Sequence, residues 1–327
     1  MHAWRGHAYG TPDSLVWEEV PGRPLDDGQV RIAVEAAAVN FPDVLYVAGT
    51  YQVKPTPPFV PGFEVAGTVL ESRIEGLPVG ARVASTLDGS GGYATEAIGY
   101  ALGTHRIPDA MPFTDAAAIT ITYQTGWFGL HRRARLQAGE WLLVHAGAGG
   151  VGSAAIQLGK AAGAKVIATA GGADKVEACR KLGADVVVDY AKEDFVAVVK
   201  SVTGGSGADV VYDPVGGDVF DKSTKCIAWE GRIVVVGFTS GRFPEARANH
   251  LLVKNYGVLG LHWGMYNLRD PAAVLKAQHD LYALYLEGKI KPLVSATMPM
   301  ALAREAMQKV ASRGSTGKLV LLNAPQS

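Results

Sequence analysis

Residues 144–152 read Val-His-Ala-Gly-Ala-Gly-Gly-Val-Gly and contain the pattern Gly-x-Gly-x-x-Gly. A short apolar run precedes this stretch, and a segment rich in Ala, Leu and Ile follows it. A strand, a glycine-rich turn and a helix in this order form the βαβ unit that binds dinucleotides. We expect Gly147 to allow a sharp turn, Gly149 to let a pyrophosphate approach the backbone, and Gly152 to let the helix pack closely. The phosphates would lie at the helix N-terminus, where N–H groups and the helix dipole favour negative charge.

The composition is that of a globular protein with a sizeable core and no excess of charge. The chain has 327 residues, 48% of them hydrophobic, with 31 basic and 31 acidic side chains. This balance gives no electrostatic reason to expect a nucleic acid or an anionic membrane as a partner. Cys179 and Cys226 supply neither a disulfide framework nor a four-cysteine zinc lobe, which favours a reducing compartment. Because no signal-peptide core or bilayer-length apolar stretch is present, we expect a cytoplasmic location.

The first third of the chain shows the alternation of apolar and polar residues that is typical of half-buried strands. It is clearest in segments 30–36, 65–71 and 81–85, with Pro and Gly between them. A compact β-rich domain of short strands is therefore predicted. Two helical patterns and a last strand, which could rejoin this domain, follow near the C-terminus at 270–286, 298–310 and 318–322.

From about residue 115 the pattern changes to short apolar runs that alternate with helical patterns. Runs of Val, Ile, Leu and Ala that are apolar throughout are typical of strands buried on both faces of a parallel sheet. The fold class predicted is therefore α/β, a doubly wound parallel sheet beside a β-rich domain. The six runs are 141–145, 165–169, 185–189, 208–213, 232–236 and 257–261, and the helical patterns between them are 150–162, 173–182, 192–203 and 218–228.

The end of the second run, 165–170, predicts which dinucleotide is bound. In NAD-binding folds this strand ends in Asp or Glu, which holds the ribose 2′-hydroxyl. Here Gly171-Gly172 follow the strand, and the first carboxylate is Asp174. Lys175 can supply positive charge to a 2′-phosphate, and Tyr190 could add a hydroxyl or stack on the adenine. The sequence favours NADP(H) over NAD(H), although Lys175 could also be an ordinary solvated lysine.

Taken together, five segments resemble the zinc-free branch of the medium-chain dehydrogenase/reductase superfamily, the zeta-crystallin-like quinone oxidoreductases. The resemblance covers nearly the whole chain and implies a GroES-like domain at 1–120 and 263–327, with a Rossmann domain at 121–262. The segments that carry it are Ala38-Val-Asn-Phe-Pro-Asp43, Pro61-Gly-Phe-Glu-Val-Ala-Gly67, His145-Ala-Gly-Ala-Gly-Gly-Val-Gly152, Asp213-Pro-Val-Gly-Gly217 and Gly314-Ser-Thr-Gly-Lys318.

The same resemblance implies that no zinc is bound. Zinc-dependent relatives carry Cys where this chain has Asn40, His where it has Phe63, and a third ligand in the segment here reading 121–125. Catalytic zinc needs about three N, S or O ligands from the protein, and Phe63 offers none. Quinones and conjugated enones are electrophilic enough to accept hydride with hydrogen-bond assistance alone.

The resemblance therefore implies hydride transfer from NADPH to a quinone. Reduction of a C=C bond in an enone or enoyl-thioester is the alternative, because the pocket residues do not decide between the two acceptors. A structural, crystallin-like or RNA-binding role is less favoured, since the charge is balanced and no basic, aromatic stripe is present. Relatives commonly pair the sixth strand of the nucleotide domain across a two-fold axis, so we expect a homodimer.

The candidate site residues follow from the resemblance. Asn40 could donate an amide hydrogen to a developing oxyanion, or merely satisfy a local turn. Tyr46 and Tyr51 could donate a hydrogen bond or proton, or serve as packing residues. Glu64 is expected to be structural. The residues expected to bind cofactor are Asn40, Asp43, Thr125, Gly147, Ala148, Gly149, Gly150, Val151, Gly152, Gly171, Gly172, Lys175, Tyr190, Val215, Gly216, Gly237, Phe238, Leu261, His262, Trp263 and Lys318.

Overall fold

The computed structural model describes residues 1–89 and 91–323, which form two compact units. The first, here called the β-rich unit, comprises Met1–Ile121 and the chain from Pro292 onward. The second, the parallel-sheet unit, comprises Thr122–Lys291. The predicted fold class, a GroES-like β domain with a doubly wound parallel-sheet domain, is confirmed. Within the described ranges, no helix has both the length and the apolar character needed to cross a membrane.

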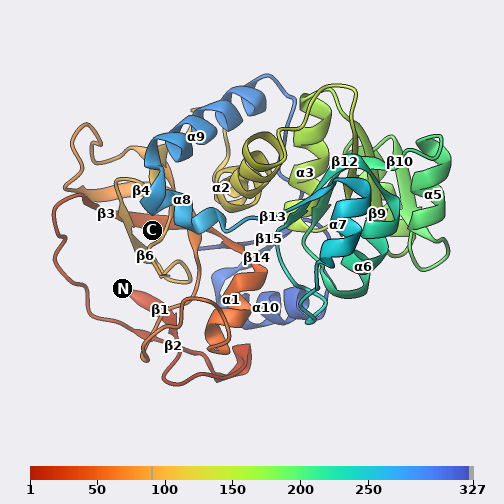
Figure 1. Ribbon diagram of the computed structural model, residues 1–327. Coiled ribbons are helices and arrows are strands. Elements are labelled where there is room, and N and C mark those ends of the chain that lie inside the picture. The colour runs from red at the N-terminus through yellow and green to blue at the C-terminus, as the bar shows by residue number, and fades with distance from the viewer. Residues whose placement is uncertain (90, 324–327) are drawn as a thin grey trace. The chain divides into compact units, whose positions relative to one another are not determined.

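The β-rich unit is built on one mixed sheet with strand order β14-β15-β3-β4-β5-β7, to which β6 adds by pairing with β3. Figure 1 labels β3, β4 and β6 of this sheet, with β14 and β15 from the C-terminal part of the chain. The last strand does rejoin this sheet, because Leu319 lies opposite Val39 in an antiparallel ladder. A separate two-stranded sheet joins β1 (His2–Arg5) and β2 (Val16–Glu19). The strands of the main sheet are β3 (Gln29–Val39), β4 (Glu64–Ser72), β5 (Arg82–Thr86), β6 (Glu96–Tyr100), β7 (Thr104–Arg106), β14 (Val294–Pro299) and β15 (Lys318–Leu322).

Helices of the β-rich unit pack on this sheet around an apolar core. The helix predicted at 298–310 begins only at Ala303, because Met298 and Pro299 pair with β15 as the end of β14. Leu87, Tyr93, Met300 and Met307 belong to the buried core cluster. The helical elements are the 3-10 turns η1 (Pro12–Ser14) and η4 (Met300–Leu302), with α1 (Phe41–Val47), α10 (Ala303–Ala311) and the first part of α2 (Phe113–Trp127).

The parallel-sheet unit contains six strands in the order β10-β9-β8-β11-β12-β13, all paired in parallel. The central runs are fully buried, as continuous apolar sequence predicts: Leu142 to Val144 and Val166 to Ala168 are all 0% exposed. The strands are β8 (Trp141–Val144), β9 (Lys165–Ala170), β10 (Val186–Asp189), β11 (Ala208–Asp213), β12 (Ile227–Val235) and β13 (Gly257–Gly260).

Helices connect these strands and continue past the last of them. After α2 the chain forms the π-helical segment η2 (Phe128–Arg133). The remaining elements are α3 (Gly150–Ala161), α4 (Ala173–Lys181), α5 (Phe195–Val202), α6 (Gly217–Cys226), α7 (Ala248–Lys254), the 3-10 turn η3 (Trp263–Met265), α8 (Tyr266–Arg269) and α9 (Pro271–Leu286).

Residues 263–291 lie in the parallel-sheet unit, whereas the sequence placed the second boundary at 262/263. The physical reason is the packing of α9. Val274 and Ala277 form an apolar cluster with Phe128, and the Gln124 amide donates a 2.7 Å hydrogen bond to Gln278. A helix that buries its apolar face and a polar pair against its own unit remains part of that unit, and the predicted boundary missed this contact.

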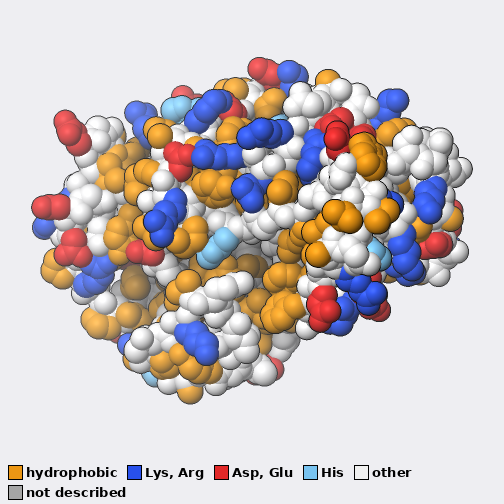
Figure 2. Space-filling model, in the orientation of Figure 1, with side chains coloured by type: hydrophobic (Ala, Val, Ile, Leu, Met, Phe, Trp, Pro, Cys, Tyr) orange, Lys and Arg blue, Asp and Glu red, His pale blue; other side chains and the backbone are white. Residues whose placement is uncertain are grey.

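Acidic and basic side chains are interspersed over the face of the molecule drawn in Figure 2, without a field of a single sign. This mixture agrees with the equal numbers of acidic and basic residues in the sequence. The two cysteines are buried, and burial raises the pKa of each thiol to about 12. Cys179 and Cys226 are therefore packing residues without thiolate chemistry.

Candidate functional site

Most of the residues expected to bind cofactor lie at the carboxyl ends of the strands of the parallel sheet. Because all six strands run in parallel, their carboxyl ends lie at the same edge. The strand order reverses direction between β8 and β11, and open α/β sheets bind ligands at such a switch point. The residues that follow the six strands in sheet order are Tyr190, Gly171, Gly147, Val215, Gly237 and Leu261.

The glycine-rich loop connects β8 to α3, whose helical residues begin at Gly150. A Cβ on Gly152 would lie 2.2 Å from the Ala146 carbonyl oxygen, so only glycine fits there. The turn itself is made by Ala146, with a φ of 50°, and not by Gly147. At Gly147 the constraint is space, because a Cβ would lie 3.0 Å from the side chains of Ala168 and Cys179. The loop thereby presents the first N–H groups of α3, which have no partner within the helix.

His145, which the sequence did not single out, anchors the start of this loop. The Ser223 hydroxyl donates to the Val219 carbonyl at 2.8 Å, so its oxygen accepts from His145 Nε2–H, also at 2.8 Å. The other ring nitrogen, Nδ1, then accepts from the Thr169 hydroxyl at 3.1 Å. Burial lowers the pKa of His145 to about 3, so the ring is neutral. A neutral imidazole therefore ties β8 to both β9 and α6.

The second strand ends as the sequence predicts, without a carboxylate of its own. β9 ends at Ala170, and Gly172, with a φ of 87°, precedes α4. Asp189 at the end of β10 accepts the Gly172 N–H at 3.2 Å, and this bond is the main cause that lowers the pKa of its carboxyl. Tyr190 is 60% exposed, and a Cβ on Gly171 would lie 2.6 Å from its hydroxyl. Gly171, Gly172 and Tyr190 are thus adjacent, with Lys175 on the first turn of α4.

The fourth and fifth strand ends are joined by backbone hydrogen bonds. Asp213 Oδ1 accepts the N–H groups of Val215 and Gly216 at 2.8 and 2.9 Å. Burial raises the pKa of this carboxyl, and the two N–H groups oppose that shift. The backbone of the segment after β12 donates to the Pro214 and Val215 carbonyls. The segment 213–217 is therefore held rigidly against the segment 237–240.

The sixth strand end is held by a chain of buried amides. Trp263 Nε1 donates to Gln124 at 3.0 Å, and Gln124 in turn donates to Gln278. The Leu261 N–H donates to the Val235 carbonyl, whereas the His262 side chain is exposed. Thr125 lies in α2, one residue after Gln124, and is 8% exposed. The indole of Trp263 is therefore fixed by α2, while His262 has no bond that assigns it a role.

In the β-rich unit, Asn40, Glu64 and Lys318 form a buried group in which each touches the other two. The Lys318 ammonium donates to Asn40 Oδ1 at 2.5 Å and to Glu64 Oε1 at 2.9 Å. The Asn40 amide nitrogen donates to Glu64 Oε1 at 2.9 Å and to the Ala38 carbonyl at 3.3 Å. None of the three is more than 6% exposed. Glu64 also accepts the Ile121 N–H at 3.0 Å.

These contacts change what Asn40 and Lys318 can do. Both N–H bonds of the Asn40 amide are used within the protein, so the structure gives no support to the expectation that it donates to an oxyanion. The Lys318 ammonium is likewise bound to Asn40 and Glu64, and this gives no support to the expectation that it contacts a cofactor phosphate. Glu64, expected to be structural, accepts three hydrogen bonds at this point.

Asp43 extends the buried group toward the loop that precedes β6. Its Oδ2 accepts the Asn40 backbone N–H at 2.7 Å and the Tyr93 hydroxyl at 2.8 Å, while Oδ1 has no partner. Complete burial outweighs these bonds and raises the pKa of Asp43 to about 7. Tyr93, which the sequence did not indicate, is fully buried. Asp43 thus holds the first turn of α1 and is not positioned as a surface cofactor ligand.

The tyrosines that follow on α1 and after it pack around Phe63. The Tyr46 ring meets Phe63 edge-on with centroids 5.1 Å apart, and the Tyr51 ring lies 5.7 Å from Phe63. Tyr46 is 5% exposed, whereas Tyr51 and Phe63 are partly buried. Burial, with a smaller effect from Asp43, raises the pKa of the Tyr51 phenol. Of the two tyrosines, Tyr51 is the more exposed.

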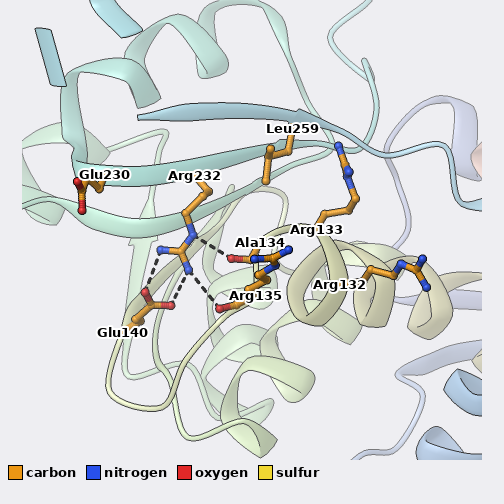
Figure 3. A pocket seen from close by; sticks show the side chains of 8 residues that line it. All are labelled: Arg132, Arg133, Ala134, Arg135, Glu140, Glu230, Arg232 and Leu259. Carbon is orange, nitrogen blue, oxygen red and sulfur yellow. Dashed lines mark hydrogen bonds and ion pairs between the residues drawn. The ribbon is translucent and has the colours of Figure 1, made fainter. Parts of the chain in front are cut away.

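A hollow of about 530 Å³ lies near the amino ends of the strands of the parallel sheet, opposite their carboxyl ends. The Arg232 guanidinium fills part of it with paired hydrogen bonds of 2.9 and 2.8 Å to the Glu140 carboxylate and further bonds to the Ala134 and Arg135 carbonyls (Figure 3). This arginine thereby links β12 to the segment before β8. Its guanidinium N–H groups form these hydrogen bonds within the protein.

The strand order and the glycine-rich loop place the parallel-sheet unit in the class of dinucleotide-binding α/β proteins. Comparison with known families agrees: the family described as zinc-binding dehydrogenase matches residues 150–277, and the alcohol dehydrogenase GroES-like domain matches residues 26–109. The quinone oxidoreductase-like protein 2 homolog of Nematostella vectensis is 41% identical over 301 residues, which are 91% of this chain and 82% of that protein. The chain belongs to the medium-chain dehydrogenase/reductase family and is an oxidoreductase similar to its quinone oxidoreductases.

Two further relatives are informative because their names state a ligand or a substrate. The Escherichia coli quinone oxidoreductase complexed with NADPH superposes with a TM-score of 0.90 at 30% identity, covering 98% of this chain and all of that one. A 2-haloacrylate reductase from a Burkholderia species is 32% identical over 329 residues, which are 97% of each chain. The family resemblance identified from the sequence is thus confirmed.

The family described as zinc-binding raises the question whether a metal fits this chain. No group of three or more His, Cys, Asp or Glu side chains that could hold a metal occurs in residues 1–89 and 91–323. At the places of two of the zinc-dependent relatives' ligands stand Phe63, which has no donor atom, and Asn40, which together with the neighbouring Glu64 already binds the Lys318 ammonium. A zinc ion would have to displace a positive charge and would find an amide oxygen and a single carboxylate. The donor set does not fit zinc.

Acid stability should depend on His145. The folded ring titrates near 3 and the unfolded one near 6.5, so the unfolded chain binds an extra proton between these values. Stability is therefore lost as the pH falls below about 6.5, by up to about 1.4 kcal/mol per pH unit. His145→Gln removes this contribution, and the free energy of urea unfolding should depend less on pH between 4.5 and 6.5. The matched control is His250→Gln, at an exposed histidine. Equal slopes in the two variants would contradict the prediction.

Proposed function

We propose that this protein is an NADPH-dependent oxidoreductase that transfers hydride to a quinone without a zinc ion. The observation that carries the proposal is the Lys318 ammonium bound to Asn40 and Glu64. Because this ammonium takes the oxygens that a metal ion would need, an unactivated alcohol or ketone would lack the polarisation that zinc supplies. A quinone needs only hydrogen bonds, because hydride transfer to it gives the phenolate of an aromatic hydroquinone, which then takes up a proton.

The residues of the parallel-sheet unit support cofactor binding in this proposal. When bound, NADPH supplies the hydride. The N–H groups at the start of α3 would hold its pyrophosphate, with Gly152 keeping the loop close to the helix. Gly171 and Gly172 would face the adenosine ribose, where β9 ends without a carboxylate of its own and Lys175 can neutralise a 2′-phosphate. The nearest strand-end carboxylate, Asp189 of β10, accepts the Gly172 N–H. The segments after β11, β12 and β13 would line the nicotinamide end.

The β-rich unit supplies the groups proposed to act on the acceptor. Tyr51 holds a phenol that can donate a hydrogen bond to an oxygen on which charge develops. Phe63, backed by the buried ring of Tyr46, provides aromatic surface beside it, which suits a planar ring. Asn40 and Asp43 position α1 and are not proposed to contact the acceptor.

Reduction of a conjugated C=C bond is the second candidate, favoured by the similarity to the 2-haloacrylate reductase. It also transfers hydride to a conjugated acceptor and needs the same cofactor site. Purified protein with NADPH should consume cofactor with 1,4-benzoquinone faster than with an enone or an enoyl-thioester, followed at 340 nm. Turnover of the enone combined with no oxidation of NADPH by benzoquinone would reverse the ranking, and Tyr51→Phe should slow either reaction.

Cofactor choice should depend on Lys175. Lys175→Ala removes the only positive charge that we assign to the 2′-phosphate, so KM for NADPH should rise about tenfold, while KM for NADH stays unchanged. Lys181→Ala is the matched control, since Lys181 lies at the other end of α4 with a 76% exposed side chain. An unchanged KM for NADPH in Lys175→Ala would show that another residue selects the cofactor.

We also propose a homodimer formed through β13, the outermost strand of the parallel sheet. β13 is the terminal strand of that sheet, and α7, which precedes it, has no buried residue. Leu252 and Val253 on α7 are 78% and 71% exposed, so a second copy related by a two-fold axis could cover them and extend the sheet. Light scattering at micromolar concentration should give the mass of two chains, and Leu252→Glu should give one. Leu286→Glu, at a 62% exposed leucine of α9, is the control. A single-chain mass for the unaltered protein would refute the proposal.

A further inference from the structure

A buried ammonium is costly unless it is paired, and Lys318 is only 3% exposed. Its backbone is held by contacts that do not involve its side chain. Gly317 has a φ of 60°, and a Cβ there would lie 2.0 Å from the Leu293 carbonyl oxygen. That same oxygen accepts the Lys318 N–H at 2.7 Å. The glycine therefore lets the start of β15 approach Leu293 closely, and the following residue enters the core of the β-rich unit.

We infer that Lys318 is a positioning residue whose ammonium acts as the internal cation of this site, taking the oxygens of Asn40 and Glu64 that a bound metal ion would need. In its kinetic consequence the inference rests on the proposed function. Lys318 touches no reacting atom in the proposed reaction. It acts through Asn40, the residue at which β3 ends and α1 begins, and so on the helix that carries Tyr46 and leads to Tyr51.

The hydrogen bonds trace this action step by step. Lys318 donates to the Asn40 side-chain oxygen, which turns the amide nitrogen toward Glu64. The backbone N–H of Asn40 donates to the Asp43 carboxylate within α1. Asp43 also receives the Tyr93 hydroxyl. One ammonium thus fixes an amide, two carboxylates and a phenol.

The charges in this group make Lys318 necessary in a way that packing alone would not. Apart from Lys318, the charged side chains that face this group are the carboxylates Glu64 and Asp43, and the Lys318 charge lowers the pKa of Asp43 while Glu64 raises it. Removing the ammonium leaves the Glu64 carboxylate buried without a cation. A buried charge that has lost its partner is strongly destabilising. Removing the charge of Glu64 as well restores neutrality.

The first experiment compares Lys318→Met with Lys309→Met, an exposed lysine on α10. Loss of the ammonium should raise the titration midpoint of the Asp43 carboxyl, followed by ¹³C NMR of the side-chain carbon, and Lys309→Met should leave it in place. Lys318→Met should also lower the melting temperature by at least about 5 °C. The double variant Lys318→Met with Glu64→Gln should recover most of that loss. These readouts need no turnover, so they decide the role of Lys318 even if the proposed function fails.

The second experiment tests the kinetic consequence in the double variant, which keeps the fold. Its kcat with 1,4-benzoquinone should fall at least about tenfold, while KM for NADPH stays within about twofold, because the cofactor groups lie in the other unit. An unchanged kcat would overturn the positioning role and leave the proposed function standing. An Asp43 midpoint and a melting temperature equal to those of Lys309→Met would overturn the inference altogether. So would one zinc ion per chain, measured after dialysis against zinc and lost in Glu64→Gln.

Discussion

The buried contact of Lys318 with Asn40 and Glu64 is the constraint on which the β-rich unit depends. It joins the last strand of the chain to the end of β3 and the start of β4, and Glu64 extends the link to α2. Because a lone buried charge costs several kcal/mol, no partner can be withdrawn without disturbing the others. The C-terminal strand is therefore required for the geometry at Asn40 as well as for completing the sheet.

In the parallel-sheet unit the geometry is set by the register of the six parallel strands and by burial, without a buried ion pair like that of Lys318 and Glu64 among its described residues. All six strands end at one edge, and the connections at that edge are fixed by hydrogen bonds to buried side chains. His145 is held neutral by burial, and one carboxylate oxygen of Asp213 and one of Asp189 each accept two backbone N–H groups. An edge built this way offers fixed N–H groups to an anionic ligand and keeps the glycine-rich loop in one conformation.

The sequence predicted the features that depend on local pattern. Continuous apolar runs gave the six parallel strands, the glycine spacing located the loop before α3, and the missing acid after β9 was found as expected. It could not predict contacts between distant segments. The N-terminal bounds of α10 depend on the pairing of Met298 with β15, and the assignment of 263–291 depends on α9 packing against Phe128. Neither contact leaves a periodic trace in the sequence.

The role of Asn40 shows the same limit at the level of one side chain. An asparagine in the place of a zinc ligand suggests a hydrogen-bond donor to substrate, and nothing within its own segment argues otherwise. The direction of its amide is set by Lys318, 278 residues later, whose ammonium accepts no hydrogen bond and so requires the amide oxygen. The amide nitrogen must then face Glu64. In this chain the ammonium therefore neutralises the buried Glu64 carboxylate and sets the direction of the Asn40 amide at the same time.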